Sequence, residues 1–365
     1  MFVHVCEHEF VMEFVPATSR LLAANRAAAG FYAAQLRHVA AARNYLHARG
    51  IEAAAGSWWQ PGYAPGGWTA VLDKLTTLGF TTDELLAAGL VRRSRTDRLI
   101  DYLHHRVVFP IHDRRCNIIG FTGRDLSGRP DAPKYLNTPT TVVYHKGEAL
   151  FGLGPQLAYR RRRDRRPMRI VVVEGAADAI AVHRMVAGAR LRETPEVQYL
   201  HGELLMPVAL CGIVLTEHHL RLLREAIGGA APLTLVLDGD DAGRDAFERW
   251  LPLLRTWCGP VDIATLPDGT DPAELLVQHG PKGALRTILD ALRPAQLARL
   301  DRILDRLEPA ALDLDEPETR VRVWRAITPC FRDDPCRGAD MAELASTRLG
   351  LPLADVMTGV VNEIA

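Results

Sequence analysis

Acidic residues follow two apolar stretches of this chain, and each stretch has the composition of a buried β-strand. Glu174 comes directly after the run Ile170-Val-Val-Val173, while Asp238 and Asp240 come after Leu235-Val-Leu237. In parallel α/β sheets, ligands bind at the carboxyl ends of the strands. Mg²⁺ prefers hard oxygen ligands and usually takes one or two protein carboxylates. This spacing therefore indicates a divalent-cation site.

The same acidic residues have a simpler interpretation as helix N-caps, because Asp is favoured at that position. A stretch with helical character follows each motif, from Ala177 to Val186 and from Ala242 to Leu254. Sequence alone does not separate the two interpretations for either motif, since short motif matches carry a risk of false positives. The two motifs taken together are more specific than either one.

Together the motifs resemble the acidic signature of the Toprim domain, which occurs in DnaG-type primases, topoisomerases and some nucleases. The resemblance rests on Glu174-Gly-Ala-Ala-Asp178, on Asp238-Gly-Asp-Asp-Ala-Gly243, and on the third segment Pro267-Asp-Gly-Thr-Asp271. It implies a set of catalytic residues, a set of metal ligands and two secondary acidic residues. The catalytic set is Glu174, Asp238 and Asp240; the metal ligands are these three and Asp268; the secondary residues are Asp178 and Asp271.

A block between residues 106 and 153 narrows the resemblance to the catalytic core of DnaG-type primases. Two expected strands, Arg106–Asp113 and Asn117–Arg124, read as a hairpin. The segments Pro133-Lys-Tyr-Leu-Asn-Thr-Pro139 and Tyr144-His-Lys-Gly147 follow, and both resemble that family closely. The resemblance places Arg124, Lys134 and Lys146 on a basic surface that holds template and nucleotide. Lys and Arg side chains suit this role because they bind phosphates whatever the base sequence.

One segment departs from the family pattern. Where the family usually carries further arginines, this chain has His104 and His105. We therefore expect one basic contact to be weaker, or to be made by Arg98 or Arg106. The loop from Trp58 to Trp68 is rich in turn residues and aromatics, which could stack on bases, although packing between helices is the favoured interpretation.

The length of the chain leaves room for two or three domains, and its composition is that of an ordinary globular protein. It has 365 residues, of which 48% are hydrophobic and 24% charged, with a formal net charge of +0, so a basic surface must be local. We predict an α/β fold: an N-terminal α+β basic subdomain (1–158), a Toprim-type α/β sheet domain (159–283) and a C-terminal helical bundle (284–365). Residues 188–206 read as an insertion without an assigned role.

The cysteines and the hydropathy pattern bear on cofactors and location. The six cysteines include no C-x-x-C pair, so we expect no zinc site. The chain has no secretory signal pattern and no apolar run of about 18 residues, so we expect a cytoplasmic protein without membrane contact. The resemblance covers the middle of a complete primase, without its zinc-binding and helicase-binding domains.

The resemblance implies a DNA primase, a nucleotidyltransferase that joins ribonucleotides into RNA primers for replication. It implies Mg²⁺ or Mn²⁺ as cofactor, with two ions, and single-stranded DNA and ribonucleoside triphosphates as partners. A replicative helicase, or a separate protein supplying zinc binding and initiation, is a further candidate partner. Two alternatives stay open: a Toprim nuclease, and a non-catalytic nucleic-acid-binding subunit of a replication complex.

Overall fold

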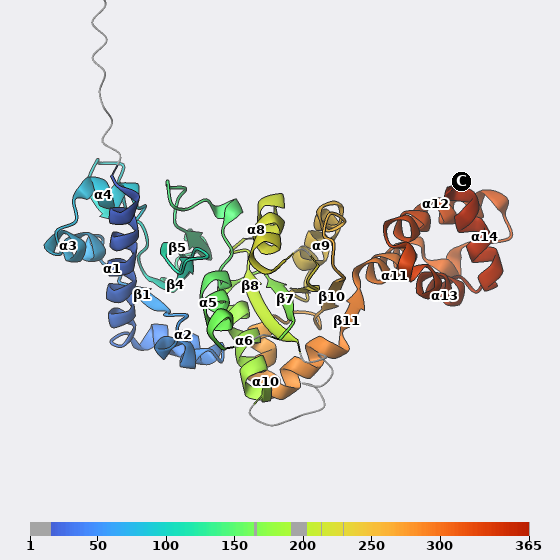
Figure 1. Ribbon diagram of the computed structural model, residues 1–365, viewed down its shortest axis with the longest axis horizontal. Helices are drawn as coiled ribbons and strands as arrows, with labels where there is room; N and C mark the ends of the chain where they lie inside the picture. Colours follow the sequence, from blue (N-terminus) through green and yellow to red (C-terminus); the bar gives the residue numbers. More distant parts are fainter. Residues whose placement is uncertain (1–15, 164–165, 191–202, 213, 229, 365) are drawn as a thin grey trace, which may run out of the picture. The chain divides into compact units, whose positions relative to one another are not determined.

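The computed structural model describes residues 16–163, 166–190, 203–212, 214–228 and 230–364 (Figure 1). Contacts between residues divide the chain into two units. Among the described residues, the first unit contains 16–43 together with 60–113 and 117–146, and the second contains 44–59, 114–116 and those from 147 onward. The division into domains at 158 and 283 stays a prediction, because the contacts define two units and not three.

The first unit is a small antiparallel sheet covered by helices. Its main sheet has the strand order β1-β4-β5-β6, and β2 pairs with β3 separately. The strands β4 and β5 are antiparallel, which confirms the expected hairpin. The elements are α1 (Thr18–Leu36), the start of α2 (Ala40–Ala48, which crosses the boundary between the units), β1 (Gly62–Ala64), α3 (Ala70–Thr77), α4 (Thr82–Ala87), β2 (Val91–Arg93), β3 (Leu99–Asp101), β4 (Arg106–His112), β5 (Ile118–Asp125) and β6 (Tyr135–Asn137).

The core of the first unit forms where α1 lies on the sheet. Tyr32 of α1 is buried and meets Phe121 of β5 edge to face, with ring centroids 5.5 Å apart. Gly62 of β1 is needed for this approach, because a Cβ atom there would lie 2.6 Å from the backbone of Tyr32. Helix and sheet are therefore held in close contact.

The second unit is organised around a five-stranded sheet with the order β11-β10-β9-β7-β8. The strands β10, β9, β7 and β8 are parallel, and β11 is antiparallel at the edge. This confirms the expected α/β fold. Its elements are α5 (Leu153–Arg163), β7 (Met168–Val173), α6 (Ala176–Arg190), β8 (Leu204–Ala209), α8 (Glu217–Ile227), β9 (Leu233–Leu237), α9 (Asp241–Leu254), β10 (Val261–Thr265), α10 (Pro272–Asp290) and β11 (Leu292–Pro294).

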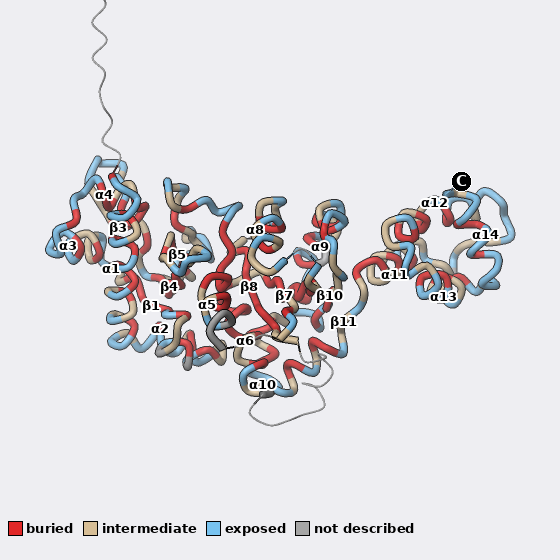
Figure 2. Tube along the Cα trace, viewed as in Figure 1, coloured by how far each residue is buried: buried red, intermediate tan, exposed pale blue. Residues whose placement is uncertain are grey.

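Both faces of this sheet are covered by helices, and Figure 2 shows its central strands buried. Ile170 and Val172 of β7 face a core that also holds Leu220 of α8 and Phe247 of α9. On the other face, α6 and α10 pack against each other and contact the strands. Continuous apolar strands are expected in such a sheet because neither face meets water.

The expected insertion at 188–206 needs correction at both ends. Helix α6 continues to Arg190, and Leu204–Met206 form the start of β8. Residues 191–202 lie outside the described residues. The apolar run Leu204–Ala209 forms the strand β8. It contains Pro207, which β8 accommodates because it has one neighbour in the order of the sheet.

A network of polar contacts crosses the sheet at the amino ends of its strands. The Arg169 guanidinium lies 2.6 Å from a carboxylate oxygen of Glu203 and 2.7 Å from one of Asp262. It also donates to the hydroxyl of Thr234, at 3.1 Å. Arg169 thereby connects β7 with β9, with β10 and with the residue before β8.

The C-terminal part of the second unit is helical, as expected. Its helices are α11 (Ala295–Leu307), α12 (Pro317–Asp333), α13 (Gly338–Leu349) and α14 (Leu353–Ile364). They enclose a core of their own that includes Leu300, Trp324 and Met341. None of the helices in the described ranges combines the length and hydropathy that a membrane span needs.

Candidate active site

The strand order brings the three acidic motifs to one edge of the sheet. Glu174 follows β7, Asp238 follows β9, and Asp268 lies in the loop after β10. Since β10, β9 and β7 are adjacent and parallel, their carboxyl ends share that edge. Motifs that lie far apart in the chain are therefore neighbours in the fold.

Backbone contacts join the second and third motifs directly. The amide of Gly239 donates to the carbonyl of Thr270 at 2.9 Å, and the amide of Gly269 donates to the carbonyl of Gly239 at 2.8 Å. A Cβ atom at position 239 would lie 2.0 Å from the carbonyl oxygen of Pro267, so only glycine fits there. These contacts fix the loop that carries Asp238 and Asp240.

Asp178 lies on the first turn of α6 and is surrounded by the carboxylates of the three acidic motifs. Burial raises the pKa of its carboxyl well above the usual range, and the negative charges of Asp271, Asp238 and Glu174 raise it further. Arg49 opposes this effect. These three charges come one from each acidic motif, in agreement with the shared edge of the sheet.

Two of the acidic residues cap helices, as the simpler interpretation of the motifs allowed. The carboxylate of Asp240 accepts a hydrogen bond from the Gly243 amide at 2.8 Å, at the start of α9. Asp271 accepts one from the Glu274 amide at 2.8 Å and completes a capping box at the start of α10. Both contacts leave carboxylate lone pairs for other partners.

Arg49, which directly follows α2, places a positive charge beside the acidic residues at this edge. Its guanidinium forms an ion pair with Asp271 and lies 3.9 Å from a carboxylate oxygen of Glu274. Both Arg49 and Asp271 are largely shielded from solvent, with 19% and 17% of their side chains exposed. The arginine therefore offsets part of the negative charge that the acidic motifs concentrate here.

The donor chemistry of the edge suits hard divalent cations. One carboxylate oxygen of Glu174 and one of Asp238 are shielded from solvent, where a cation would compensate their charge. Within the described ranges, no three or more His, Cys, Asp or Glu side chains form a ready-made metal-binding group.

The basic residues Arg124 and Lys134 come together in the first unit. The strands β5 and β6 pair Arg124 with Tyr135, and Lys134 immediately precedes Tyr135. The Arg124 guanidinium lies 5.4 Å from the centre of the Tyr135 ring, and the Lys134 ammonium lies 6.0 Å from it. Tyr135 and Lys134 are exposed, so these three side chains form a basic and aromatic surface. Lys146 is also exposed, in a short 3₁₀ turn at residues 146–148.

The aromatic loop divides into a packed part and an exposed part. Trp59 is 3% exposed and stacks on Trp58 and Phe151, as the packing interpretation predicts. Trp68 is 50% exposed and its ring lies 4.3 Å from that of His104. Burial lowers the pKa of His104, and the positive charges of its basic neighbours lower it further. These neighbours, in the order of their effect, are His105, Arg106, Arg92 and Arg129.

Arg106 does not replace the missing family arginine. It is 5% exposed, and it donates to the carbonyl oxygens of Gly123 and Pro133 at 3.1 and 2.9 Å. Its guanidinium also lies 3.6 Å from Asp125. Of the two arginines considered for the missing contact, Arg106 is buried and Arg98 is exposed, so Arg98 is the one accessible to a ligand.

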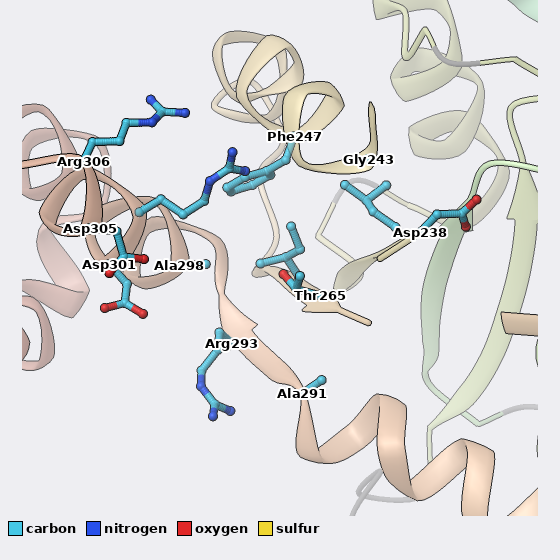
Figure 3. A pocket seen from close by; sticks show the side chains of 13 residues that line it. Asp238, Gly243, Phe247, Thr265, Ala291, Arg293, Ala298, Asp301, Asp305 and Arg306 are labelled. Carbon is cyan, nitrogen blue, oxygen red and sulfur yellow. The ribbon is translucent and has the colours of Figure 1, made fainter. Parts of the chain in front are cut away.

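A cavity of about 460 Å³ lies beside Asp238 in the second unit (Figure 3). Four of its charged side chains are in ion pairs: Arg302 and Arg306 each lie 3.6 Å from Glu248, and Arg348 pairs with Asp301 and Asp305. The cavity has the volume of a small-molecule site but presents mainly an apolar wall. That wall is formed by Leu237, Phe247, Ile263 and Ala298.

Comparisons with known proteins agree with this arrangement. Residues 31–156 match the family model of the N-terminal domain of the DNA primase catalytic core, and residues 171–276 match a Toprim-like model. The DNA primase of Mycolicibacterium smegmatis is 37% identical over 318 residues, which cover 85% of this chain and 46% of the relative. The chain thus spans about half the length of the curated relatives it matches.

Solved structures match almost the whole chain. The RNA polymerase domain of the Mycobacterium tuberculosis primase DnaG superposes with a TM-score of 0.72 at 31% identity, over 91% of this chain and 99% of that domain. A DnaG primase catalytic domain bound to single-stranded DNA superposes with a TM-score of 0.68 at 28% identity, over 92% of this chain and 98% of that one.

Proposed function

Because this chain belongs to the DnaG-type DNA primases and matches their catalytic core, we propose that it joins ribonucleotides into short RNA primers on single-stranded DNA. The observation that carries this proposal is the gathering of three acidic motifs at the carboxyl edge of one parallel sheet. The exposed basic surface of the first unit supports it, since a nuclease or polymerase site needs bound nucleic acid.

The acidic edge is the place we assign to divalent cations. Glu174, Asp238, Asp240 and Asp268 would hold two Mg²⁺ or Mn²⁺ ions, and Asp178 and Asp271 would add negative charge around them. When bound, such ions supply activation of a ribose 3′-hydroxyl and neutralisation of the departing pyrophosphate. The shielded carboxylate oxygens of Glu174 and Asp238 fit this role, because they lack solvent to stabilise their charge.

The protein side chains have separable roles in this proposal. Glu174 serves as a metal ligand or as the base that accepts the hydroxyl proton. Lys134, Lys146 and Arg124 bind phosphates of the template or the triphosphate, and the buried Nε of Arg124 has no hydrogen-bond partner among the described residues. Trp68 offers an exposed ring on which a base of the single strand stacks.

The partners follow from the reaction. We assign single-stranded DNA as template, in agreement with the solved relative that binds it, and ribonucleoside triphosphates as substrates. A replicative helicase and a separate zinc-binding initiation factor are further candidates. A cytoplasmic location agrees with these partners.

The test is primer synthesis on single-stranded DNA with labelled ribonucleotides and Mg²⁺ or Mn²⁺. The native protein is compared with Glu174→Gln, Asp238→Asn and the control Asp355→Asn, which changes an exposed carboxylate at the start of α14. Each protein is assayed with and without a pre-annealed primer. We expect products from the native protein and the control only.

The outcomes separate the alternatives. Products that require the annealed primer would mean that the core extends strands and needs a partner to initiate. Metal-dependent cleavage of DNA without nucleotides would favour a Toprim nuclease. Intact DNA binding without synthesis or cleavage in any condition would refute the enzymatic proposal and favour a binding subunit.

A further inference from the structure

The segment that follows Lys146 is fastened to the sheet of the second unit. Phe151 forms an isolated bridge with Ala209, the last residue of β8, through hydrogen bonds of 2.9 and 3.1 Å. Ala149 and Leu150 are buried between this bridge and the turn at Gly147. Ala209 pairs with Val173, the last residue of the parallel neighbour β7. The bridge therefore lies at the carboxyl ends of the strands, beside the point where Glu174 follows β7.

A second contact holds the other end of this segment. The hydroxyl of Thr216 donates to the carbonyl oxygen of Gly147, at 2.6 Å. Thr216 is also the N-cap of α8: its hydroxyl oxygen accepts a hydrogen bond from the His219 amide at 3.1 Å. Thr216 thus uses both capacities of its hydroxyl, as acceptor for the helix and as donor to the turn.

Gly147 and Thr216 are also in van der Waals range of each other. A Cβ atom on Gly147 would lie 3.5 Å from the Thr216 methyl group, an ordinary packing distance. The neighbouring pair of His218 and Glu148 is looser, at 3.8 Å and about half exposed, and contributes little. The Thr216 hydroxyl is therefore the main polar contact of this turn with α8 among the contacts described.

We propose that Thr216 is a positioning residue for Lys146, acting through its hydrogen bond to the carbonyl of the next residue. Lys146 is exposed, and its four-carbon side chain has many rotamers, so a loose backbone would spread its ammonium over a large volume. Fixing the adjacent peptide reduces that freedom before a phosphate binds. This inference rests on the proposed function, in which Lys146 binds a phosphate of nucleotide or template.

We call the hydrogen bond from the Thr216 hydroxyl to the Gly147 carbonyl the tether. Three substitutions separate its effect from the effect of the helix cap. Thr216→Ser keeps both the acceptor and the donor. Thr216→Asp keeps a favoured N-cap acceptor but has no proton to donate. Thr216→Val loses both functions. The difference between Thr216→Asp and Thr216→Ser therefore measures the effect of the hydrogen bond to Gly147. The difference between Thr216→Val and Thr216→Asp measures the effect of the helix cap.

The first measurement is amide hydrogen exchange at residues 146–149, which needs no activity. We expect faster exchange of these amides in Thr216→Asp than in the native protein and Thr216→Ser, with the exchange of α8 unchanged. Equal exchange in Asp, Ser and native proteins would overturn the tether.

The second measurement is the kinetics of primer extension. The loss of one neutral hydrogen bond predicts that Thr216→Asp raises KM for the ribonucleotide about three- to tenfold, and that Thr216→Ser restores it. The variant Lys146→Ala should change the same kinetic constant, and adding Thr216→Asp to it should have no further effect. Additive effects of the two substitutions would refute positioning of Lys146 by Thr216.

The two measurements distinguish failure of the tether from failure of the proposed function. Faster exchange in Thr216→Asp, from a native protein that makes no primers, would keep the tether and reject the primase proposal. A strong effect of Lys146→Ala, together with native exchange and kinetics in Thr216→Asp, would keep the primase proposal and reject the tether.

Discussion

The ion pair between Arg49 and Asp271 joins parts of the chain that are 222 residues apart, and its removal has a calculable effect. We predict that Arg49→Met destabilises the protein, since methionine keeps an unbranched apolar side chain but leaves Asp271 without its cation. Two unit charges about 4 Å apart interact by about 4 kcal/mol at an effective dielectric constant of about 20. Exposure of nearly a fifth of both side chains, and the cap contact that Asp271 retains, reduce the net loss to about 1–3 kcal/mol.

The assay is denaturant unfolding, with thermal unfolding for Tm, of the native protein, Arg49→Met, Asp271→Asn and the double variant. The expected loss corresponds to a decrease in Tm of about 3–9 °C for a unit of this size. The double variant should show a coupling of at least about 1 kcal/mol between the two positions. Arg286→Met is the control, because its ion pair with Asp290 is about 70% exposed and should contribute less than about 0.5 kcal/mol.

A loss below about 0.5 kcal/mol in Arg49→Met, with no coupling to Asp271→Asn, would refute this reasoning. It would mean that solvent already screens the acidic edge. The pKa of Asp178 offers a second check, because Arg49 lowers it. Arg49→Met should therefore raise the pKa of Asp178 further, which NMR titration of the carboxyl carbon measures.

Three further predictions follow from individual residues. Asp238→Asn should weaken Mn²⁺ binding at least about tenfold with little loss of stability, as measured by calorimetry; unchanged binding would remove Asp238 from the cation site. Trp68→Ala should weaken single-stranded DNA binding about 5- to 100-fold in a fluorescence anisotropy assay, because stacking contributes about 1–3 kcal/mol per base; Leu78→Ala, at a similarly exposed position, should have no effect. Burial raises the pKa of Asp101 to about 6 in the folded state, above its unfolded value of about 3.9, so its contribution to stability is largest below pH 4 and is lost as pH rises through 6. The unfolding free energy of the native protein relative to Asp101→Asn should therefore fall by about 1–3 kcal/mol between pH 4 and pH 7, and a pH-independent difference would contradict it.

Much of the fold could be predicted because its signals are local. The apolar, β-branched runs before Glu174 and Asp238 predicted two strands, and two strand-like segments separated by a short turn, around Phe109 and Phe121, predicted a hairpin. These patterns depend on periodicity within a few residues. The strand Leu204–Ala209 was not predicted, because its first residues were assigned to an insertion and its place in the sheet depends on pairing with the distant strand β7.

The site was harder to predict because its decisive features are contacts between distant residues. Nothing near Arg49 in the sequence indicates that its partner is Asp271, and the only local signal was its place at a helix end before Gly50. Trp68 and Trp59 lie in one loop and have the same composition around them, yet one is half exposed and the other buried. Arg106 has the residue type that binds phosphate, but the position is inside the first unit.

The network around Arg169 lies at the opposite edge of the sheet from the acidic motifs. Its ion pairs with Glu203 and Asp262 join the amino ends of the strands, so the sheet has a polar fastening that does not involve Glu174 or Asp238. Substitutions at the carboxyl edge can therefore change the chemistry while the strands keep their order. A sheet divided in this way is evolvable: one edge preserves the architecture, and the other is free to exchange catalytic residues.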